Sequence, residues 1–185
     1  MRLFAVGGGV RAAPVAVTRC VHGVAQAGFM KYSFQPLRLR EALTVAQWHY
    51  PAPYEMYDLA RGPLLTSVVM HHLQAPFGRM GFYGVHASIE ELVGVFSFQV
   101  IQHTVELGLG LRPDLTGQHH GLGFVAAGME FARAKYAPHQ FRLDVAVFNQ
   151  RAIQVYLRAG FTPGSRFMRY TRLGLHEFME MTRPA

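Results

Sequence analysis

The sequence predicts an α/β fold of the α+β kind: a mixed, mostly antiparallel central sheet of about six to seven strands flanked by helices. Residues 82–87, 92–101 and 104–111 form three strand-like runs with only short connections, as expected of an antiparallel meander. A helical pattern over 123–135 then leads to a fourth run, 141–148. Since a strand–helix–strand unit crosses over right-handed, the strands before and after this helix should be parallel.

The remaining elements follow in chain order. Residues 37–40 are predicted to form the first strand, followed by helical regions at 41–49 and 54–73. After the run at 141–148 comes a short helix, and two final strands complete the sheet. Apolar residues near the C-terminus are predicted to pack in the core from a strand: Phe178, Met179 and Met181.

The first motif that points to a ligand is Gln118-His119-His120-Gly121-Leu122-Gly123, where a strand gives way to a helix. Without a Cβ atom, Gly121 and Gly123 let the backbone approach an anion, and the free N–H groups of the first helical turn can bind it. A glycine-containing turn without any ligand is an equally open interpretation of this motif alone. The apolar residues that follow predict one buried stripe: Phe124, Ala127, Phe131 and Ala134.

The second motif covers residues 149–161 and follows the run at 141–148. Asn149 is a suitable helix N-cap. The inward stripe of the helix is predicted to consist of Ala152, Val155, Tyr156 and Ala159. Gly160 and Phe161 have a structural explanation, because glycine at C′ and an apolar residue at C″ form a Schellman cap. Asn149 and Tyr156 are therefore the candidates for function in this motif.

Together the two motifs resemble those of the GNAT superfamily of acyl-CoA-dependent N-acyltransferases, over about residues 36–183. The loop motif of that family (Gln or Arg, two residues, Gly, one residue, Gly or Ala) is satisfied by residues 118–123, and the Asn-Ala-Tyr-Gly-Phe helix matches its other signature. The resemblance implies a GNAT-like sheet, splayed between the strands 104–111 and 141–148 to admit pantetheine. It also implies an N-acetyltransferase that moves an acetyl group from acetyl-CoA to a primary amine by direct attack on the thioester.

The resemblance assigns roles to individual residues. Those expected to bind acetyl-CoA are Leu109, Leu111, Gln118, His119, His120, Gly121, Leu122, Gly123 and Asn149. Tyr156 is expected to protonate the departing thiolate, as the matching tyrosine does in the family. Glu106 is the first candidate for the catalytic base, since it starts the strand that leads into the loop, and His103 is the second. A solvated strand-edge carboxylate is an equally open interpretation of Glu106.

The acceptor is an amine of a small molecule or of a protein. The aromatic segment 48–54, with Tyr57, resembles one found in a bacterial subgroup, in which the early helices wall the acceptor pocket. A non-catalytic acyl-CoA-binding module is the alternative function. It would bind the cofactor without releasing thiol in the presence of an amine.

Composition excludes several other classes. The formal net charge is +7, but the basic residues are scattered and form no Lys/Arg run, so we expect no nucleic-acid partner. No apolar stretch is long enough to span a bilayer, and we expect no membrane partner. Adjacent histidine pairs and the lack of a His-Glu-x-x-His motif argue against a metal. The one cysteine, Cys20, fits a reducing, cytoplasmic location. A homodimer remains open.

The chain is predicted to divide into an N-terminal extension, 1–35, and one N-acetyltransferase domain, 36–185. Residues 1–29 are rich in Gly, Ala and Val and contain no acidic residue. We expect the extension to be disordered or to precede the native start, with translation beginning at Met30; a functional targeting peptide is the alternative interpretation.

Overall fold

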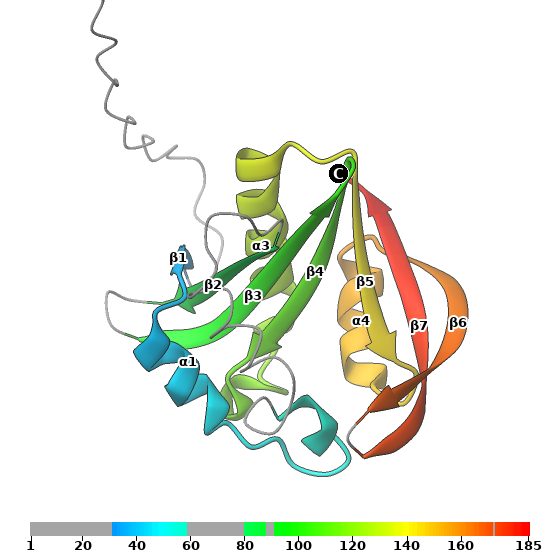
Figure 1. Cartoon of the computed structure of the whole chain (residues 1–185), viewed down its shortest axis with the longest axis horizontal. Coiled ribbons are helices and arrows are strands. Elements are labelled where there is room, and N and C mark those ends of the chain that lie inside the picture. Colours follow the sequence, from blue (N-terminus) through cyan, green and yellow to red (C-terminus); the bar gives the residue numbers. More distant parts are fainter. Residues whose placement is uncertain (1–30, 59–79, 88–90, 172) are drawn as a thin grey trace, which may run out of the picture.

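The computed structural model describes residues 31–58, 80–87, 91–171 and 173–185. Within them lies one seven-stranded sheet with the strand order β1-β2-β3-β4-β5-β7-β6 (Figure 1). The strands are β1 (Ser33–Pro36), β2 (Met80–His86), β3 (Leu92–Ile101), β4 (Thr104–Leu111), β5 (Gln140–Ala146), β6 (Thr162–Thr171) and β7 (Gly174–Pro184). The helices are α1 (Leu39–Ala46), α3 (Gly121–Tyr136) and α4 (Gln150–Arg158), with short 3₁₀ helices η1 (Glu55–Tyr57) and η3 (Pro113–Leu115).

The predicted pairing of the strands is confirmed. Strands β2, β3 and β4 form an antiparallel meander, and β4 pairs in parallel with β5 across the crossover helix α3. All other neighbours are antiparallel. The sheet is therefore mixed and mostly antiparallel, as expected.

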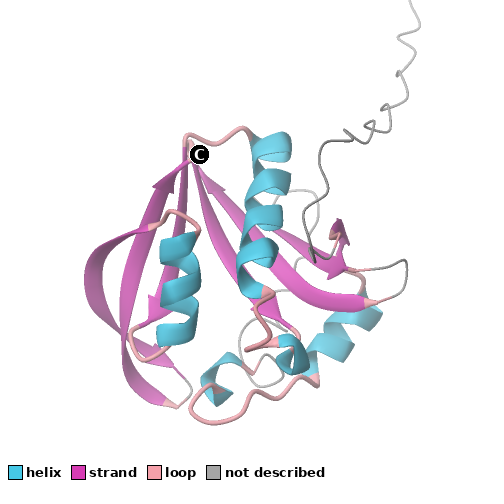
Figure 2. Cartoon of the chain, turned by 180° about the vertical axis from the view of Figure 1, so that it is seen from behind, coloured by secondary structure: helices cyan, strands magenta, loops and turns pink. Residues whose placement is uncertain are grey.

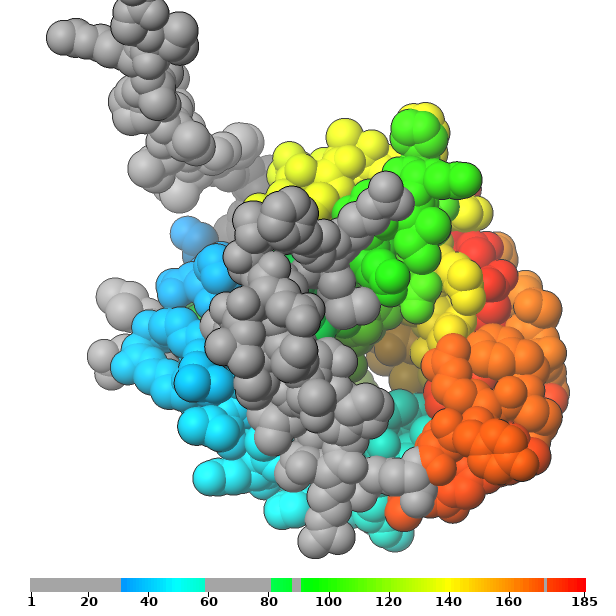
Figure 3. Space-filling view, in the orientation of Figure 1, coloured from blue at the N-terminus to red at the C-terminus, as the bar shows by residue number. Residues whose placement is uncertain are grey.

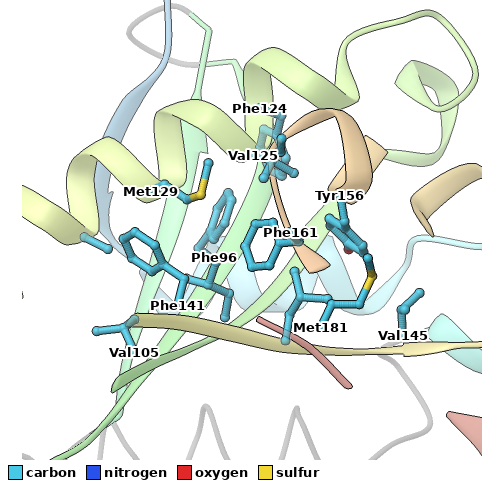
Figure 4. Packing of buried hydrophobic residues seen from close by; sticks show 14 of the residues in the cluster. Phe96, Val105, Phe124, Val125, Met129, Phe141, Val145, Tyr156, Phe161 and Met181 are labelled. Atoms are coloured by element: carbon cyan, nitrogen blue, oxygen red, sulfur yellow. The ribbon is translucent and has the colours of Figure 1, made fainter. Parts of the chain in front are cut away.

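Helices cover both faces of the sheet. Helices α3 and α4 lie on the face seen in Figure 2, and α1 lies on the face seen in Figure 1. The main core fills the space between the sheet and α3 and α4 (Figure 4), and its buried residues include Phe96, Val105, Phe124, Met129, Phe141, Tyr156, Phe161 and Met181. The predicted burial of Phe178, Met179 and Met181 is confirmed.

The predicted stripe of α3 was partly wrong. Phe124 is buried as expected, but Ala134 is exposed, and the buried residues of this helix are Phe124, Val125, Gly128, Met129 and Ala132. The cause is Gly128, where a Cβ atom would lie 2.3 Å from the Phe96 ring. The missing side chain lets this face of α3 approach the sheet, which turns Ala134 toward solvent.

Helix α4 begins and ends as predicted. The Asn149 side chain accepts a hydrogen bond of 3.2 Å from the N–H of Ala152. Gly160 has φ +85°, and the N–H groups of Gly160 and Phe161 donate to the carbonyls of Leu157 and Tyr156. This is a Schellman cap. The predicted inward stripe omitted Ile153, which is buried beside Tyr156.

The predicted first strand, 37–40, was wrong. The strand ends at Pro36, and Leu39 already belongs to α1. The reason is a local interaction: the N–H of Arg38 donates to the Glu41 carboxylate at 2.9 Å, which fixes the start of the helix. Of the predicted helix 54–73, only residues up to 58 are described, and residues 55–57 form η1.

No helix among the described residues has the length and apolar character needed to cross a membrane.

Candidate functional site

The central feature of the site is a fork between β4 and β5. These strands pair only from Thr104↔Gln140 to Glu106↔Arg142. Beyond that rung, residues 107–111 of β4 stay paired with β3, and residues 143–146 of β5 stay paired with β7. The resemblance implied a splay at this place, and the strand pairing shows it.

The free edge of β4 faces into this fork. Alternate residues of a strand direct their N–H and C=O groups to opposite neighbours. The N–H of Arg112 donates to the carbonyl of Val93, on the β3 side. The amides of Leu109 and Leu111 must therefore point away from β3, toward the fork. None of the described strands pairs with them there, so they can bind an extended ligand or an oxyanion.

The phosphate loop, residues 112–120, leads from β4 to the start of α3. Gln118 holds it by donating a 2.6 Å hydrogen bond to the carbonyl of Asp114. Two of its residues are left-handed, Gly117 (φ +80°) and His119 (φ +65°). His120 occupies the N-cap position but makes no side-chain capping hydrogen bond.

No described side chain thus caps the first turn of α3, formed by Gly121, Leu122 and Gly123. These N–H groups and the positive end of the helix dipole are the kind of groups that can bind an anion.

Tyr156 and Asn149 both lie beside the fork, on α4 and at its start. Tyr156 is 9% exposed. Burial, and to a lesser degree the nearby Tyr57, raise the pKa of Tyr156 well above its usual range. The phenol therefore keeps its proton at neutral pH.

The segment 47–58 covers the fork from the α1 side. Tyr50 donates a 2.8 Å hydrogen bond from its hydroxyl to the carbonyl of Leu111. Asp58 folds the segment by accepting from the Tyr50 N–H at 2.8 Å and lying 3.2 Å from the His49 ring nitrogen. Figure 3 shows the surface hollowed between this cyan segment and the orange strand β6. The sequence indicated an aromatic wall here, but the bond from Tyr50 to β4 joins residues 61 positions apart and had no sequence signal.

The two candidate bases lie at different places. Glu106 is on the last paired rung, at the apex of the fork. It shares the α1 face of the sheet with Arg142, which contacts Glu180 at 2.8 Å. His103 lies in the β3–β4 turn, stacked on His139 with ring centroids 4.4 Å apart, at the opposite end of β4 from the phosphate loop.

Solved structures share this fold. A chimera of the spermidine N-acetyltransferase SpeG from Vibrio cholerae and hSSAT superposes with a TM-score of 0.70 at 13% identity, covering 83% of this chain and 95% of that one. The spermidine N-acetyltransferase from Vibrio cholerae in complex with CoA and spermine gives 0.63 at 16% identity, with the same coverage. No curated protein matches the chain.

A sequence profile described as the acetyltransferase (GNAT) family matches residues 41–161. That span contains both motifs, the fork and Tyr156. The match confirms the predicted enzyme class, a transferase that moves an acetyl group to an amine. The chain therefore belongs to the GNAT family of acetyltransferases.

Proposed function

We propose that acetyl-CoA is the acetyl donor and that it binds along the fork. The diphosphate accepts hydrogen bonds from the uncapped first turn of α3, and the pantetheine arm extends along the free edge of β4. The fork carries this proposal, because it directs unpaired strand amides and the N–H groups of a helix start at the same space. Residues 118–123, Leu109, Leu111 and Asn149 keep their predicted roles in cofactor binding.

The reaction is a direct attack of the amine on the thioester carbonyl. An alkylamine is protonated at neutral pH, and removing this proton costs roughly 4 to 5 kcal/mol at a pKa near 10.4. Glu106 takes the proton. It lies three residues from Leu109, about 10 Å along the strand, so the proton passes through water.

The remaining steps use groups at the fork. The amine nitrogen forms the C–N bond while the N–H groups of Leu109 and Leu111 stabilise the oxyanion. When the C–S bond breaks, the electron pair leaves with sulfur, and Tyr156 gives its proton to the thiolate. The second proton of the attacking nitrogen passes through water to the Tyr156 phenolate, which restores the phenol. The products are the amide and free CoA.

The proposed acceptor is a small-molecule alkylamine. The named structural neighbours act on spermidine, and an aromatic segment covers this fork. We place the enzyme in the cytoplasm, which fits its single cysteine.

Two measurements test the function. Calorimetry with acetyl-CoA at millimolar concentration should detect saturable binding. Release of free thiol over a panel of alkylamines, peptides and amino-bearing antibiotics should then identify at least one acceptor. Absence of binding heat would contradict the cofactor assignment, whereas binding without thiol release from any amine would leave a non-catalytic CoA-binding module.

Asn149 can be tested apart from its capping role. Asn149→Ala should lower the free energy of unfolding by about 1 kcal/mol through loss of the cap on Ala152, and should weaken CoA binding. Asn149→Ser restores a cap but lacks the amide group that would reach pantetheine. We expect Asn149→Ser to recover stability in denaturant titrations and not CoA affinity. Full CoA affinity in Asn149→Ser would show that Asn149 is only a cap.

A further inference from the structure

A cluster of four aromatic rings lies on the α1 side of the fork. It consists of Tyr54 and Tyr57, from the covering segment, Phe148, which follows β5, and His176, on β7. Phe148 is central, with ring centroids 6.1 Å from Tyr54, 6.4 Å from Tyr57 and 5.9 Å from His176. We call these residues the aromatic cluster. Nothing in the reaction described above uses Phe148 or His176.

Two polar atoms of the cluster are buried without a hydrogen-bond partner: Oη of Tyr57 and Nε2 of His176. The Tyr57 oxygen lies close enough to the Asn149 side chain and the Ala146 backbone to be influenced by them, but neither contact has hydrogen-bond geometry. Buried polar groups are nearly always satisfied, so two unsatisfied atoms around one ring need an explanation. A ligand that donates hydrogen bonds would satisfy both.

The cluster is placed next to the reacting groups. Tyr57 is near enough to Tyr156 to contribute to the raised pKa of that phenol. His176 pairs with Arg169 and is on the same sheet face as Glu180, four residues further along β7, and as Asp144, which pairs with Glu180. An amine held in the cluster would thus approach the thioester from the α1 side.

The chemistry of the cluster fits an alkylammonium ion. Aromatic faces attract cations, and the Arg151 guanidinium already stacks on Tyr54 at 4.0 Å. The cation that faces His176, Arg169, is neutralised by Asp144 at 2.5 Å. Burial raises the pKa of Tyr57, which keeps its phenol neutral and its oxygen able to accept a hydrogen bond.

We propose that the aromatic cluster is the acceptor subsite, where Nε2 of His176 and Oη of Tyr57 accept hydrogen bonds from a primary alkylammonium whose chain packs on Phe148. This inference rests on the proposed function and adds to it the place where the alkylamine binds and two specificity-determining residues.

The test compares n-pentylamine, as acceptor, with N-trimethylpentylammonium, which has the same charge and chain but no N–H donor and no transferable position. The trimethyl compound should compete with pentylamine in the wild type. His176→Leu and Tyr57→Phe should each raise the KM for pentylamine about tenfold. Neither should change the inhibition constant of the trimethyl compound more than about twofold or alter CoA affinity. His176→Gln, which can place an acceptor oxygen near the Nε2 position, should recover part of the loss.

His139→Leu is the matched control, since His139 is an exposed histidine stacked on His103 away from the fork, and it should leave the KM for pentylamine unchanged. Melting temperatures establish that each variant folds.

Calorimetry of pentylamine with the CoA-saturated protein separates the two proposals. If His176→Leu and Tyr57→Phe both turn over pentylamine with the KM of the wild type, this inference is overturned and the proposed function stands. Pentylamine binding that His176→Leu abolishes, without thiol release by the wild type, would overturn the proposed function and leave the subsite standing.

Discussion

Replacing Tyr156 with phenylalanine is expected to lower kcat by about 10²-fold or more, with little change in the dissociation constant of CoA. The phenol is buried beside the fork, and its raised pKa holds the proton on oxygen. The departing thiolate would stand in the same poorly solvated space, where its affinity for a proton also rises. Proton transfer between the two is therefore the step that this variant removes. Single-turnover kinetics and calorimetry measure the two quantities separately.

Tyr136→Phe is the matched control for this variant. Tyr136 is also partly buried, and its hydroxyl lies 3.2 Å from that of Tyr83, but it is at the opposite end of α3 from the phosphate loop. Loss of that hydroxyl should lower stability without lowering kcat.

Because burial keeps Tyr156 protonated, kcat of the wild type should also show no decrease from phenol ionisation up to about pH 10. A Tyr156→Phe enzyme with unchanged kcat would remove the acid role and leave solvent as the proton source.

The sequence predicted those parts of the fold that depend on local patterns. Strands β3 and β4 have the predicted ends, because alternating apolar residues and a tight turn fix both strands and their register. The cap at Gly160 was predictable for the same reason, since its conformation is set by neighbours on the helix. The first strand was misplaced because Leu37 to Arg40 look extended by themselves, whereas one hydrogen bond from Arg38 to Glu41 starts a helix there.

The parts that depend on tertiary contacts were not predictable. The buried face of α3 differs from the predicted stripe because Gly128 packs against the ring of Phe96, which lies 32 residues earlier in the chain, on β3. His176 offered no signal as one histidine in a strand, and it gains a role only because Phe148 brings Tyr57 close to it. Motifs thus predicted the proposed cofactor site, whereas the proposed acceptor subsite follows from contacts between distant segments.

Gly121→Trp is expected to abolish CoA binding, which calorimetry would show as a loss of more than about 100-fold in affinity. Gly121 is the first residue of α3, and a Cβ atom there would point at Val155 of α4, 3.1 Å from its γ-methyl group. An indole at this position would occupy the space between the start of α3 and α4 near Val155. It would shield the first-turn amides from a diphosphate, whose binding depends on direct approach of the anion to those N–H groups.

The collision with Val155 could also disturb packing, so the variant is best made together with Val155→Ala, which makes room for the indole. Val155→Ala alone measures the effect of the missing methyl groups. Ala126→Trp, at an exposed position one turn further along the same helix, places an equal indole away from the first turn and should bind CoA normally. If the folded double variant binds CoA as tightly as Val155→Ala, the diphosphate does not lie at the start of α3. The anion would then have to be held elsewhere, and the uncapped amides of Gly121, Leu122 and Gly123 would be served by water alone.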